Sequence, residues 1–406
     1  MEQVLYNLPD GWEWRVVNRV ALIGAEGGYS PTPDLAGNVP FVGMSDIDQK
    51  TGQKSTYELR NFDDVKTGYT KFQRNAVLFA KITPCTENNK TALIDSVDGG
   101  FATTEVFPIH ALDGVEPKYL LHFFRSPSVR HFLIEQMEGA TGRQRVPLKA
   151  LKNVRVPVCE VQEQKRIVEK LDALLTRIDT AIEHLRESVT LADVLLKNGL
   201  SQIFEALIIN CEVVPLSSVV KINSGIALPN IFKNGFSDGD LPFYKVAQMN
   251  NHREFMIDPE ITFNERIGKE HKIKLFPKGS TLIPKRGGAI LTNKKRLLLE
   301  DASYDSNIMG LKADESKISD DYLFAFMRTI DLANFVDAST IPQVNNKHID
   351  QMQIPLASIE EQADVVSRVN LLVKKVETMN SEIQSQLDDL QALKNSILDS
   401  AFKGEL

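Results

Sequence analysis

Lysine and arginine side chains gather in one stretch of this 406-residue chain, between Arg266 and Arg296. Ten basic residues lie there with a single acid, Glu270. Lysine and arginine neutralise the phosphates of nucleic acid, and arginine also donates to the edge of guanine. The stretch therefore predicts a local phosphate-binding patch, although the net charge of the whole chain is -7.

Two loops in each half of the chain carry side chains that can read base edges. AVLFAKITPCTENNKTALI in the first half and STLIPKRGGAILTNKK in the second both predict a strand that runs into a polar loop. A further pair of loops, ATGRQRVPLK from Ala140 and ASTIPQVNNK from Ala338, lies at corresponding places. The predicted DNA contacts are Lys81, Thr83, Glu87, Asn88, Asn89, Lys90, Arg143, Gln144 and Arg145 in the first half and Lys285, Arg286, Asn293, Lys294, Lys295, Gln343, Asn345, Asn346 and Lys347 in the second.

These residue types suit two different parts of a duplex. Arginine, asparagine, glutamine and glutamate recognise base edges, whereas lysine binds phosphate. For any single residue the alternative is a plain solvated loop. Their recurrence at corresponding loops of both halves favours the contact role, and the different loop sequences favour two different ligands.

No arrangement of residues in the sequence predicts catalysis. There is no G-x-x-x-x-G-K-[ST] phosphate loop, no G-x-G-x-x-G that opens a helix after a strand, and no H-E-x-x-H pair. The seven histidines are scattered, and the acidic pairs are typical of solvated turns and helix faces. We therefore predict no catalytic site and no metal site.

The elements that would position these loops are written twice. VPVCEVQEQKRIVEKLDALL and IPLASIEEQADVVSRVNLLV lie 198 residues apart, close to half the chain length. The offset places Pro157 on Pro355 and Gln164 on Gln362. Nearer the start of each half, an offset of 199 residues places one short apolar pattern on another: Val17, Val20 and Ile23 on Leu216, Val219 and Ile222. The two halves therefore share one frame that carries different loops.

Apolar residues recur at alternating spacings of four and three after each repeated phrase, which is typical of a coiled-coil seam. Each pattern predicts a helix of roughly 45 residues, about 65 Å long at 1.5 Å per residue. An apolar stripe this narrow needs a partner helix, and the simplest partner is the other copy, packed antiparallel. The predicted seam residues are Leu171, Leu175, Ile178, Ile182, Leu185 and Val189 in the first helix and Val369, Val373, Val376, Asn380, Ile383 and Leu387 in the second.

Asn380 is the one polar residue of this seam and stands where the first helix has Ile182. A polar seam residue lowers stability but fixes register or partner choice. The alternative is a tolerated position near solvent.

Composition indicates a globular chain without a membrane segment. The chain is 42% hydrophobic and 25% charged, enough for two or three domains with cores. Cys85, Cys159 and Cys211 lie far apart, so we expect a reducing compartment and predict a cytoplasmic location. No stretch approaches the roughly 18 apolar residues that a membrane span needs, so no membrane association is predicted.

These patterns predict an α+β fold. Two domains of mixed small β-sheets with helices, related by a pseudo-twofold axis, are separated by two long antiparallel coiled-coil helices. The predicted boundaries are residues 1–155 for the first domain, 156–211 for the first helix, 212–353 for the second domain and 354–406 for the second helix.

The chain resembles the specificity subunits of type I restriction-modification systems. The resemblance rests on the opening LPDGWEW, the loop AVLFAKITPCTENNKTAL, the doubled proline-to-EQ phrase and the ending LKNSILDSAFKGEL, and it covers nearly the whole chain. The first copy has QEQ where the family more usually has EEQ, and the second half carries PKRGGAI in place of an ITPC-type loop.

The resemblance implies a subunit without catalytic activity. Two target recognition domains each read one half of a split, asymmetric DNA site, and the paired helices set the gap. The implied partners are double-stranded DNA and two modification subunits, which methylate adenine with S-adenosylmethionine, so the chain itself carries no cofactor. Cleavage belongs to separate restriction subunits, whose presence the sequence does not decide.

Two other classes of function stay open at this point. A coiled-coil scaffold whose end domains bind proteins would lack salt-dependent DNA affinity. A DNA methyltransferase acting alone would need a glycine loop for its cofactor and an Asn/Asp-Pro-Pro-aromatic motif, and the sequence has neither.

Overall fold

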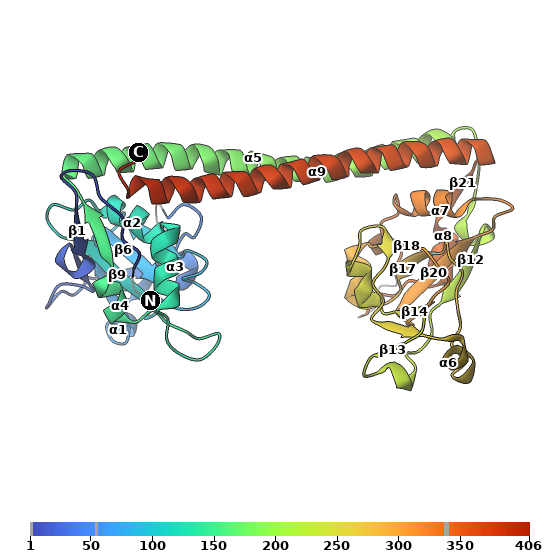
Figure 1. Cartoon of the computed structure of the whole chain (residues 1–406), viewed down its shortest axis with the longest axis horizontal. Coiled ribbons are helices and arrows are strands. Elements are labelled where there is room, and N and C mark those ends of the chain that lie inside the picture. The colour runs from blue at the N-terminus through green and yellow to red at the C-terminus, as the bar shows by residue number, and fades with distance from the viewer. Residues whose placement is uncertain (1–2, 53–55, 337–340) are drawn as a thin grey trace. The chain divides into compact units, whose positions relative to one another are not determined.

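The computed structural model describes residues 3–52, 56–336 and 341–406. The chain forms two compact units, unit 1 from residues 1–187 and 383–406 and unit 2 from residues 188–382. Each unit combines small sheets and short helices with parts of two long helices, α5 (Val161–Ile208) and α9 (Ile359–Ala401) (Figure 1). The predicted α+β class with two long helices is confirmed.

Unit 1 contains two four-stranded sheets and a two-stranded ribbon, β1-β10. The sheet β2-β9-β6-β7 is antiparallel throughout, and in the sheet β4-β3-β8-β5 the central pair is parallel. The strands are β1 (Glu13–Val16), β2 (Ala21–Ile23), β3 (Asn38–Val42), β4 (Glu58–Asn61), β5 (Thr70–Gln73), β6 (Ala76–Ala80), β7 (Thr91–Ile94), β8 (Gly99–Ala102), β9 (Val106–Ala111) and β10 (Arg155–Val158). The helices are α1 (Phe62–Val65), α2 (Pro117–Arg125), α3 (Pro127–Glu135) and α4 (Leu148–Asn153).

Unit 2 contains a five-stranded sheet, β12-β20-β17-β18-β15, a four-stranded sheet, β13-β16-β14-β19, and the ribbon β11-β21. The strands are β11 (Glu212–Pro215), β12 (Val220–Ser224), β13 (Phe236–Asp238), β14 (Leu241–Tyr244), β15 (Phe255–Met256), β16 (Ile261–Phe263), β17 (Thr281–Pro284), β18 (Arg296–Leu298), β19 (Ser303–Tyr304), β20 (Ile308–Ala313) and β21 (Gln353–Leu356). The helices are α6 (Glu265–Glu270), α7 (Asp320–Met327) and α8 (Asn346–Gln351).

A two-stranded antiparallel ribbon stands at the start of each long helix, and the two ribbons are built alike. β1 pairs with β10 just before α5, and β11 pairs with β21 just before α9. The residue after the first strand is buried in both, Val17 in unit 1 and Leu216 in unit 2. Its N–H donates a hydrogen bond of 2.8 Å, to Val154 O in unit 1 and to Met352 O in unit 2. The matched apolar pattern of the two halves therefore begins directly after the first strand of each ribbon.

The repeated glutamine docks α5 onto the domain of unit 1. Gln164 has no exposed surface, and every polar atom of its side chain is bonded. Its Oε1 accepts from Glu116 N at 2.9 Å, and its Nε2 donates to Gly114 O at 3.1 Å and to Cys159 O at 2.8 Å. Because a buried polar group without partners is costly, these three bonds fix where the helix begins on the domain.

Gln362 repeats this arrangement in unit 2 and is only 1% exposed. Its Oε1 accepts from Ser319 N at 2.9 Å, and its Nε2 donates to Lys317 O at 3.0 Å and to Ala357 O at 2.9 Å. The glutamate beside each glutamine stays near the surface instead, where Glu163 pairs with Arg166. In each half, the repeated phrase thus contains a glutamine that docks the helix and a glutamate that lies at the surface.

The repeated prolines lie in the strand that comes just before each long helix. Pro157 is part of β10 and Pro355 of β21, and each carbonyl accepts a hydrogen bond from a buried tyrosine, Tyr119 at 2.9 Å and Tyr322 at 2.8 Å. The predicted helix segments 156–211 and 354–406 therefore begin with strand, and the helices start at Val161 and Ile359.

Within each unit the two long helices run antiparallel. In unit 1, Leu171 of α5 shares a core with Leu398 of α9, and Asp179 accepts from Lys394 Nζ at 2.6 Å. Eight of the predicted seam residues are buried, namely Leu171, Leu175, Ile178, Ile182, Val369, Val373, Val376 and Ile383. Four are partly buried, namely Leu185, Val189, Asn380 and Leu387. Within the part of the chain that the structure describes, no helix is apolar enough over a sufficient length to cross a membrane.

The Oδ1 atom of Asn380 is buried and has no hydrogen-bond partner among the described residues. The register role of Asn380 stays a prediction.

The end of each long helix closes the core of the unit in which it ends. Phe402, just after α9, lies 5.1 Å from Tyr119 between ring centroids, and Phe204 of α5 lies 5.6 Å from Tyr322. In unit 1, Tyr6 near the start of the chain donates to Phe402 O at 2.8 Å. Both chain ends therefore belong to the same unit, as Figure 1 also shows.

The docking role of Gln164 predicts a large effect of one substitution. Gln164→Leu leaves one N–H and two carbonyls of unit 1 without their partner, so the free energy of unfolding should fall by about 3 kcal/mol. Gln162→Leu, at an exposed position two residues earlier, should change it by less than about 0.5 kcal/mol. Urea unfolding followed by circular dichroism measures both, and equal effects of the two substitutions would contradict the docking role.

Candidate nucleic-acid interface

The structure brings the two predicted loops of unit 1 together. The loop at residues 81–90 follows β6, and the segment at residues 138–146 follows α3 and runs alongside it. Val146 N donates to Lys81 O at 2.8 Å, and Thr83 N donates to Gln144 O at 3.0 Å. The predicted base-reading residues of this unit therefore form one continuous surface feature, which we call reading loop 1 (residues 81–90 and 138–146).

Unit 2 pairs its loops in the same way. Val344 N donates to Lys285 O at 3.0 Å, and Gly287 N donates to Pro342 O at 2.9 Å. We call this pair reading loop 2 (residues 285–294 and 341–347). The first residues of the predicted second loop, 338–340, lie outside the described residues. Both reading loops thus leave the end of a central strand, β6 or β17, and both are tied by backbone bonds to the segment that precedes a short helix.

The predicted contacts of unit 1 all have some exposed surface. Glu87, Asn88, Arg143 and Arg145 are exposed, and Lys81, Thr83, Asn89, Lys90 and Gln144 are partly exposed.

Several of these side chains already brace the loop. Lys90 Nζ donates to Met44 O at 2.6 Å, and the Arg145 guanidinium donates to both carboxylate oxygens of Glu105, at 2.7 and 2.9 Å. These bonds lower the pKa of Glu105, and burial lowers the pKa of Lys81. Glu87, Asn88 and Arg143 are therefore the residues that the loop presents most openly.

The predicted contacts of unit 2 differ more among themselves. Arg286, Asn346 and Lys347 are exposed, Lys285, Asn293, Lys294, Gln343 and Asn345 are partly exposed, and Lys295 is buried. Asn345 accepts from Lys347 N at 3.1 Å and so caps α8.

Lys295 and Asn293 hold the end of reading loop 2 in place, and their role as DNA contacts stays a prediction. Lys295 is 7% exposed and donates from Nζ to Asn293 Oδ1 at 2.6 Å and to Ile330 O. Asn293 Oδ1 also accepts from Leu332 N at 2.9 Å. Little of Lys295 is therefore exposed to a ligand in this structure. Because Arg296 is buried too, the phosphate patch is smaller than the sequence predicts.

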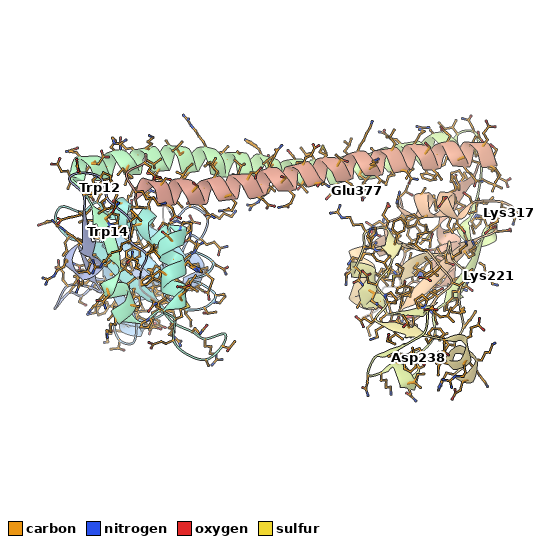
Figure 2. All side chains as sticks on the ribbon, in the orientation of Figure 1. Trp12, Trp14, Lys221, Asp238, Lys317 and Glu377 are labelled. Carbon is orange, nitrogen blue, oxygen red and sulfur yellow. The ribbon has the colours of Figure 1, made fainter. Side chains whose placement is uncertain are left out.

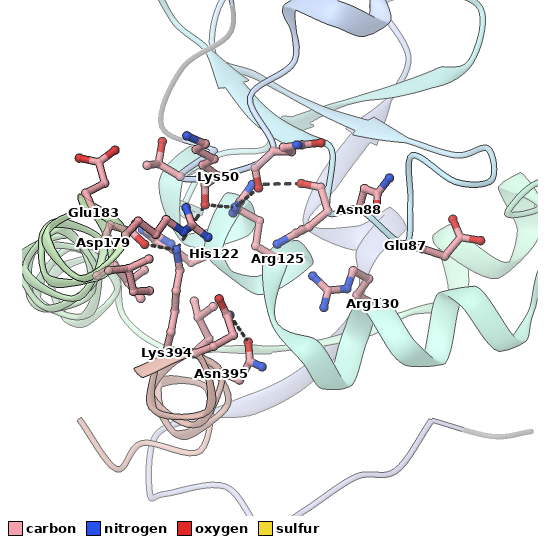
Figure 3. A pocket seen from close by; sticks show the side chains of 18 residues that line it. Lys50, Glu87, Asn88, His122, Arg125, Arg130, Asp179, Glu183, Lys394 and Asn395 are labelled. Carbon is pink, nitrogen blue, oxygen red and sulfur yellow. Dashed lines mark hydrogen bonds and ion pairs between the residues drawn. The ribbon is translucent and has the colours of Figure 1, made fainter. Parts of the chain in front are cut away.

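Arg125 at the end of α2 organises the surroundings of reading loop 1, and sequence reasoning missed it. Its side chain is 4% exposed, and its guanidinium donates to four backbone carbonyls. Figure 3 shows Arg125 beside Lys50 and Asn88. Nη1 donates to Asn89 O at 3.2 Å and Thr91 O at 2.7 Å, and Nη2 donates to Gln49 O at 3.1 Å and Lys50 O at 2.8 Å. Burial lowers the pKa of Arg125 to about 10. One charge thus ties two loops to one helix.

The turn at residues 48–52 is shaped to approach this arginine. The Asp48 carboxylate accepts from Lys50 N at 2.8 Å and from Gly52 N at 2.9 Å. Gly52 has φ +67°, and a Cβ atom there would collide with the Arg125 side chain. The aspartate followed four residues later by glycine is the signal of a tight turn that the sequence offered.

A polar cavity of about 420 Å³ lies between the loop tips and the helix pair of unit 1 (Figure 3). Lys50 and Asn88 line it from the loops, and Arg130 lines it from α3. The ion pair between Asp179 and Lys394 closes the side formed by the long helices. Lys50 and Arg130 are further cations near reading loop 1 that the sequence analysis did not single out.

Unit 2 treats the matching arginine differently. Arg328 follows α7 as Arg125 ends α2, but its guanidinium pairs with the carboxylate of Glu254. A cavity in unit 2 is lined by Arg328 and by Glu377 of α9, which Figure 2 labels. Glu377 lies 198 residues after Asp179, so it occupies the corresponding place in the repeat. The two units therefore place an arginine at the same position, but its guanidinium binds backbone carbonyls in unit 1 and a carboxylate in unit 2.

The chain is similar in sequence to known specificity proteins. The family model described as type I restriction modification DNA specificity domain matches residues 9–191 and 209–389, one match in each half. The specificity subunit of the Escherichia coli type I restriction enzyme EcoAI is 35% identical over 181 residues, 44% of this chain and only 30% of that relative. A putative type I restriction enzyme specificity subunit of Haemophilus influenzae is 24% identical over 388 residues, 92% of this chain and 90% of that protein.

Two solved structures share the fold. A chain from a structure on complex assembly and conformational transition of the type I R-M system has a TM-score of 0.81 at 21% identity, covering 99% of this chain and 100% of that one. The HsdS subunit from Thermoanaerobacter tengcongensis has a TM-score of 0.61 at 20% identity, covering 100% of both chains. At these identities the similarity is one of fold.

The carbonyl clamp of Arg125 predicts a local change in dynamics. Arg125→Met removes the donors to residues 49, 50, 89 and 91, so amide hydrogen exchange across both loops should speed up at least tenfold, since tenfold corresponds to about 1.4 kcal/mol of local stability. Arg130→Met, which lines the same cavity, is the matched control and should leave this exchange within about twofold. Equal exchange in the two variants would contradict the clamp.

The buried amine of Lys295 predicts a pH dependence. Burial lowers the pKa of Lys295 from its usual 10.5 to about 8. Between these pH values the unfolded chain binds more protons than the folded chain, so the free energy of unfolding of unit 2 should rise with pH, by roughly 3 kcal/mol at most. Lys295→Met should remove that rise, and Lys278→Met, at an exposed position, should keep it. Urea unfolding at pH 7.5, 9 and 10 measures it, and identical pH profiles for Lys295→Met and the unaltered chain would contradict the assignment.

Proposed function

The chain belongs to the type I restriction modification DNA specificity family, and from that premise we propose that it is the non-catalytic subunit that selects the DNA site. Each unit reads one half of a split site in double-stranded DNA. The two long helices set the gap between the halves. Reading loop 1 serves one half-site and reading loop 2 the other.

The single observation that carries this proposal is the shared mounting of two different reading loops. Lys81 O and Lys285 O accept equivalent backbone bonds from Val146 and Val344, so the loops hold corresponding places on their domains. Their exposed side chains differ, since Glu87 and Asn88 stand on one and Arg286 on the other. Two domains of the same build that carry different reading loops suit a DNA site with two different half-sites better than a site with two identical half-sites.

Specificity would come from side chains that meet base edges in the major groove. A good bidentate contact discriminates by about 1 to 3 kcal/mol against the wrong base. Glutamate accepts from cytosine and asparagine pairs with adenine, whereas arginine pairs with guanine. We propose Glu87 and Asn88 for the first half-site and Arg286 for the second, with Lys50, Arg130 and Lys285 near phosphates.

Partners would supply the chemistry. We propose two modification subunits that methylate adenine with S-adenosylmethionine, and restriction subunits for cleavage. Among the described residues no group of three or more metal-ligating side chains occurs. With a net charge of -7, the chain also depends on its partners for much of the positive surface that surrounds DNA.

The test is to express the chain with the modification subunit encoded beside it and to map methylated adenines across the host genome by single-molecule sequencing. A split, asymmetric motif that appears only when both chains are present is the expected result. Arg286→Ala should relax one half of that motif and leave the other half unchanged. Methylation at an unsplit motif, or methylation that persists without this chain, would overturn the proposal.

The alternative function, a scaffold whose end domains bind proteins, is not favoured by the family match. Salt separates the two functions, because each phosphate contact lowers the logarithm of affinity by about 0.9 per logarithm of salt. The proposed function expects a slope of several units for the complex on its own site. A slope near zero would favour the scaffold.

A further inference from the structure

We propose that Leu291 contacts the C5-methyl group of a thymine in the half-site read by unit 2. The inference rests on the proposed function and adds one apolar contact to it. Leu291 lies on a 3-10 turn (Gly287–Thr292) within reading loop 2. Its side chain is 65% exposed.

The surroundings of Leu291 are basic and apolar rather than acidic. Arg286 is exposed just before the turn, and Lys285 is partly exposed before it. Ile341, on the paired segment of the same reading loop, is 59% exposed. Gly287 N donates to Pro342 O, the residue after Ile341, at 2.9 Å. Two large apolar side chains thus accompany the cations of one loop.

The loop is braced so that Leu291 is held outward. Ile290, directly before it, is fully buried in the core of unit 2. Thr292 Oγ1 donates to Ala289 O at 2.6 Å, and Asn293 closes the turn in the left-handed conformation with φ +53°. The Asn293 side chain is itself fixed by Leu332 N. A leucine on such a turn loses little conformational freedom when it meets a ligand.

The two reading loops differ in the polarity of their exposed side chains. The exposed tip of reading loop 1 is polar, with Glu87 and Asn88, and Leu291 stands on the tip of the other loop. Among base edges in the major groove, the thymine methyl is the apolar group that distinguishes one base pair from the others. An exposed leucine on the same loop as Lys285 and Arg286 therefore matches a thymine better than a cytosine, which lacks the methyl group.

The experiment uses the full chain in complex with its modification subunit and the duplex found by methylation mapping. Each thymine is replaced in turn by deoxyuridine, which lacks only the methyl group, and affinity is measured at fixed salt. One replacement should weaken binding about fourfold, because burying one methyl group contributes about 0.8 kcal/mol. Leu291→Ala should weaken binding to the thymine duplex by a similar factor.

The decisive result is the combination of the two changes. The Leu291→Ala complex should bind the thymine and deoxyuridine duplexes equally, because the contact is already lost. Leu299→Ala, at a 52% exposed leucine of the same unit outside the reading loop, should keep the full difference.

Specific binding that ignores every deoxyuridine would overturn the contact while leaving the proposed function intact. A deoxyuridine effect that Leu291→Ala retains in full, or a half-site without any A·T pair, would overturn it as well. Absence of any sequence-specific binding would instead overturn the proposed function.

Discussion

Two buried glutamines hold the architecture together. Gln164 and Gln362 are each bonded to three backbone groups of the domain beside them, and each stands in the first turn of a helix of more than 40 residues. A long helix has little apolar surface of its own to fix its direction, since its narrow stripe packs equally well after a small rotation. The amide bonds remove that freedom. Everything a domain presents to a ligand then depends on where the glutamine sets its helix.

The reading loops must also be held in fixed positions, although their side chains differ between the two units. Backbone bonds from Val146 and Val344 fix the position of each loop, and buried cations fix its shape, Arg125 in unit 1 and Lys295 in unit 2. Burying a charge is unfavourable unless its donors are satisfied. Arg125 donates to four backbone carbonyls, and Lys295 donates to Asn293 Oδ1 and Ile330 O. Such preorganisation lowers the entropy cost of any contact that the few exposed side chains make with a ligand, as the proposed base reading requires.

The two long helices and the repeated organisation could be predicted because the heptad spacing and the repeated phrase are visible in the sequence alone. The doubled phrase and the heptads predict two long helices, and the structure has them at Val161–Ile208 and Ile359–Ala401. The predicted helix segments, which begin at residues 156 and 354, include Pro157 and Pro355, because the repeated phrase does not separate the short ribbon strand from the helix that follows it.

Burial is what the sequence does not reveal at the candidate interface. Lys295 counts as a cation in any charge pattern, yet it is buried next to reading loop 2. The residues around Arg125 in the sequence do not indicate that its side chain binds four backbone carbonyls. Leu291 reads as an ordinary apolar residue until its exposure is known. The loops could be located from their polarity and correspondence, but the role of each side chain depends on contacts between segments far apart in the chain.

The central claim is that the paired helices fix the gap between two separately read half-sites. The most direct measurement inserts one heptad after Glu187 and another after Glu382, at the two places where the compact units divide the helices, and maps methylated adenines with the modification subunit present. Seven residues add about 10 Å of helix, or about three base pairs of duplex. The account predicts a gap that grows by up to about three base pairs while both half-site sequences stay the same. Methylation at the original gap, or at altered half-sites, would contradict it.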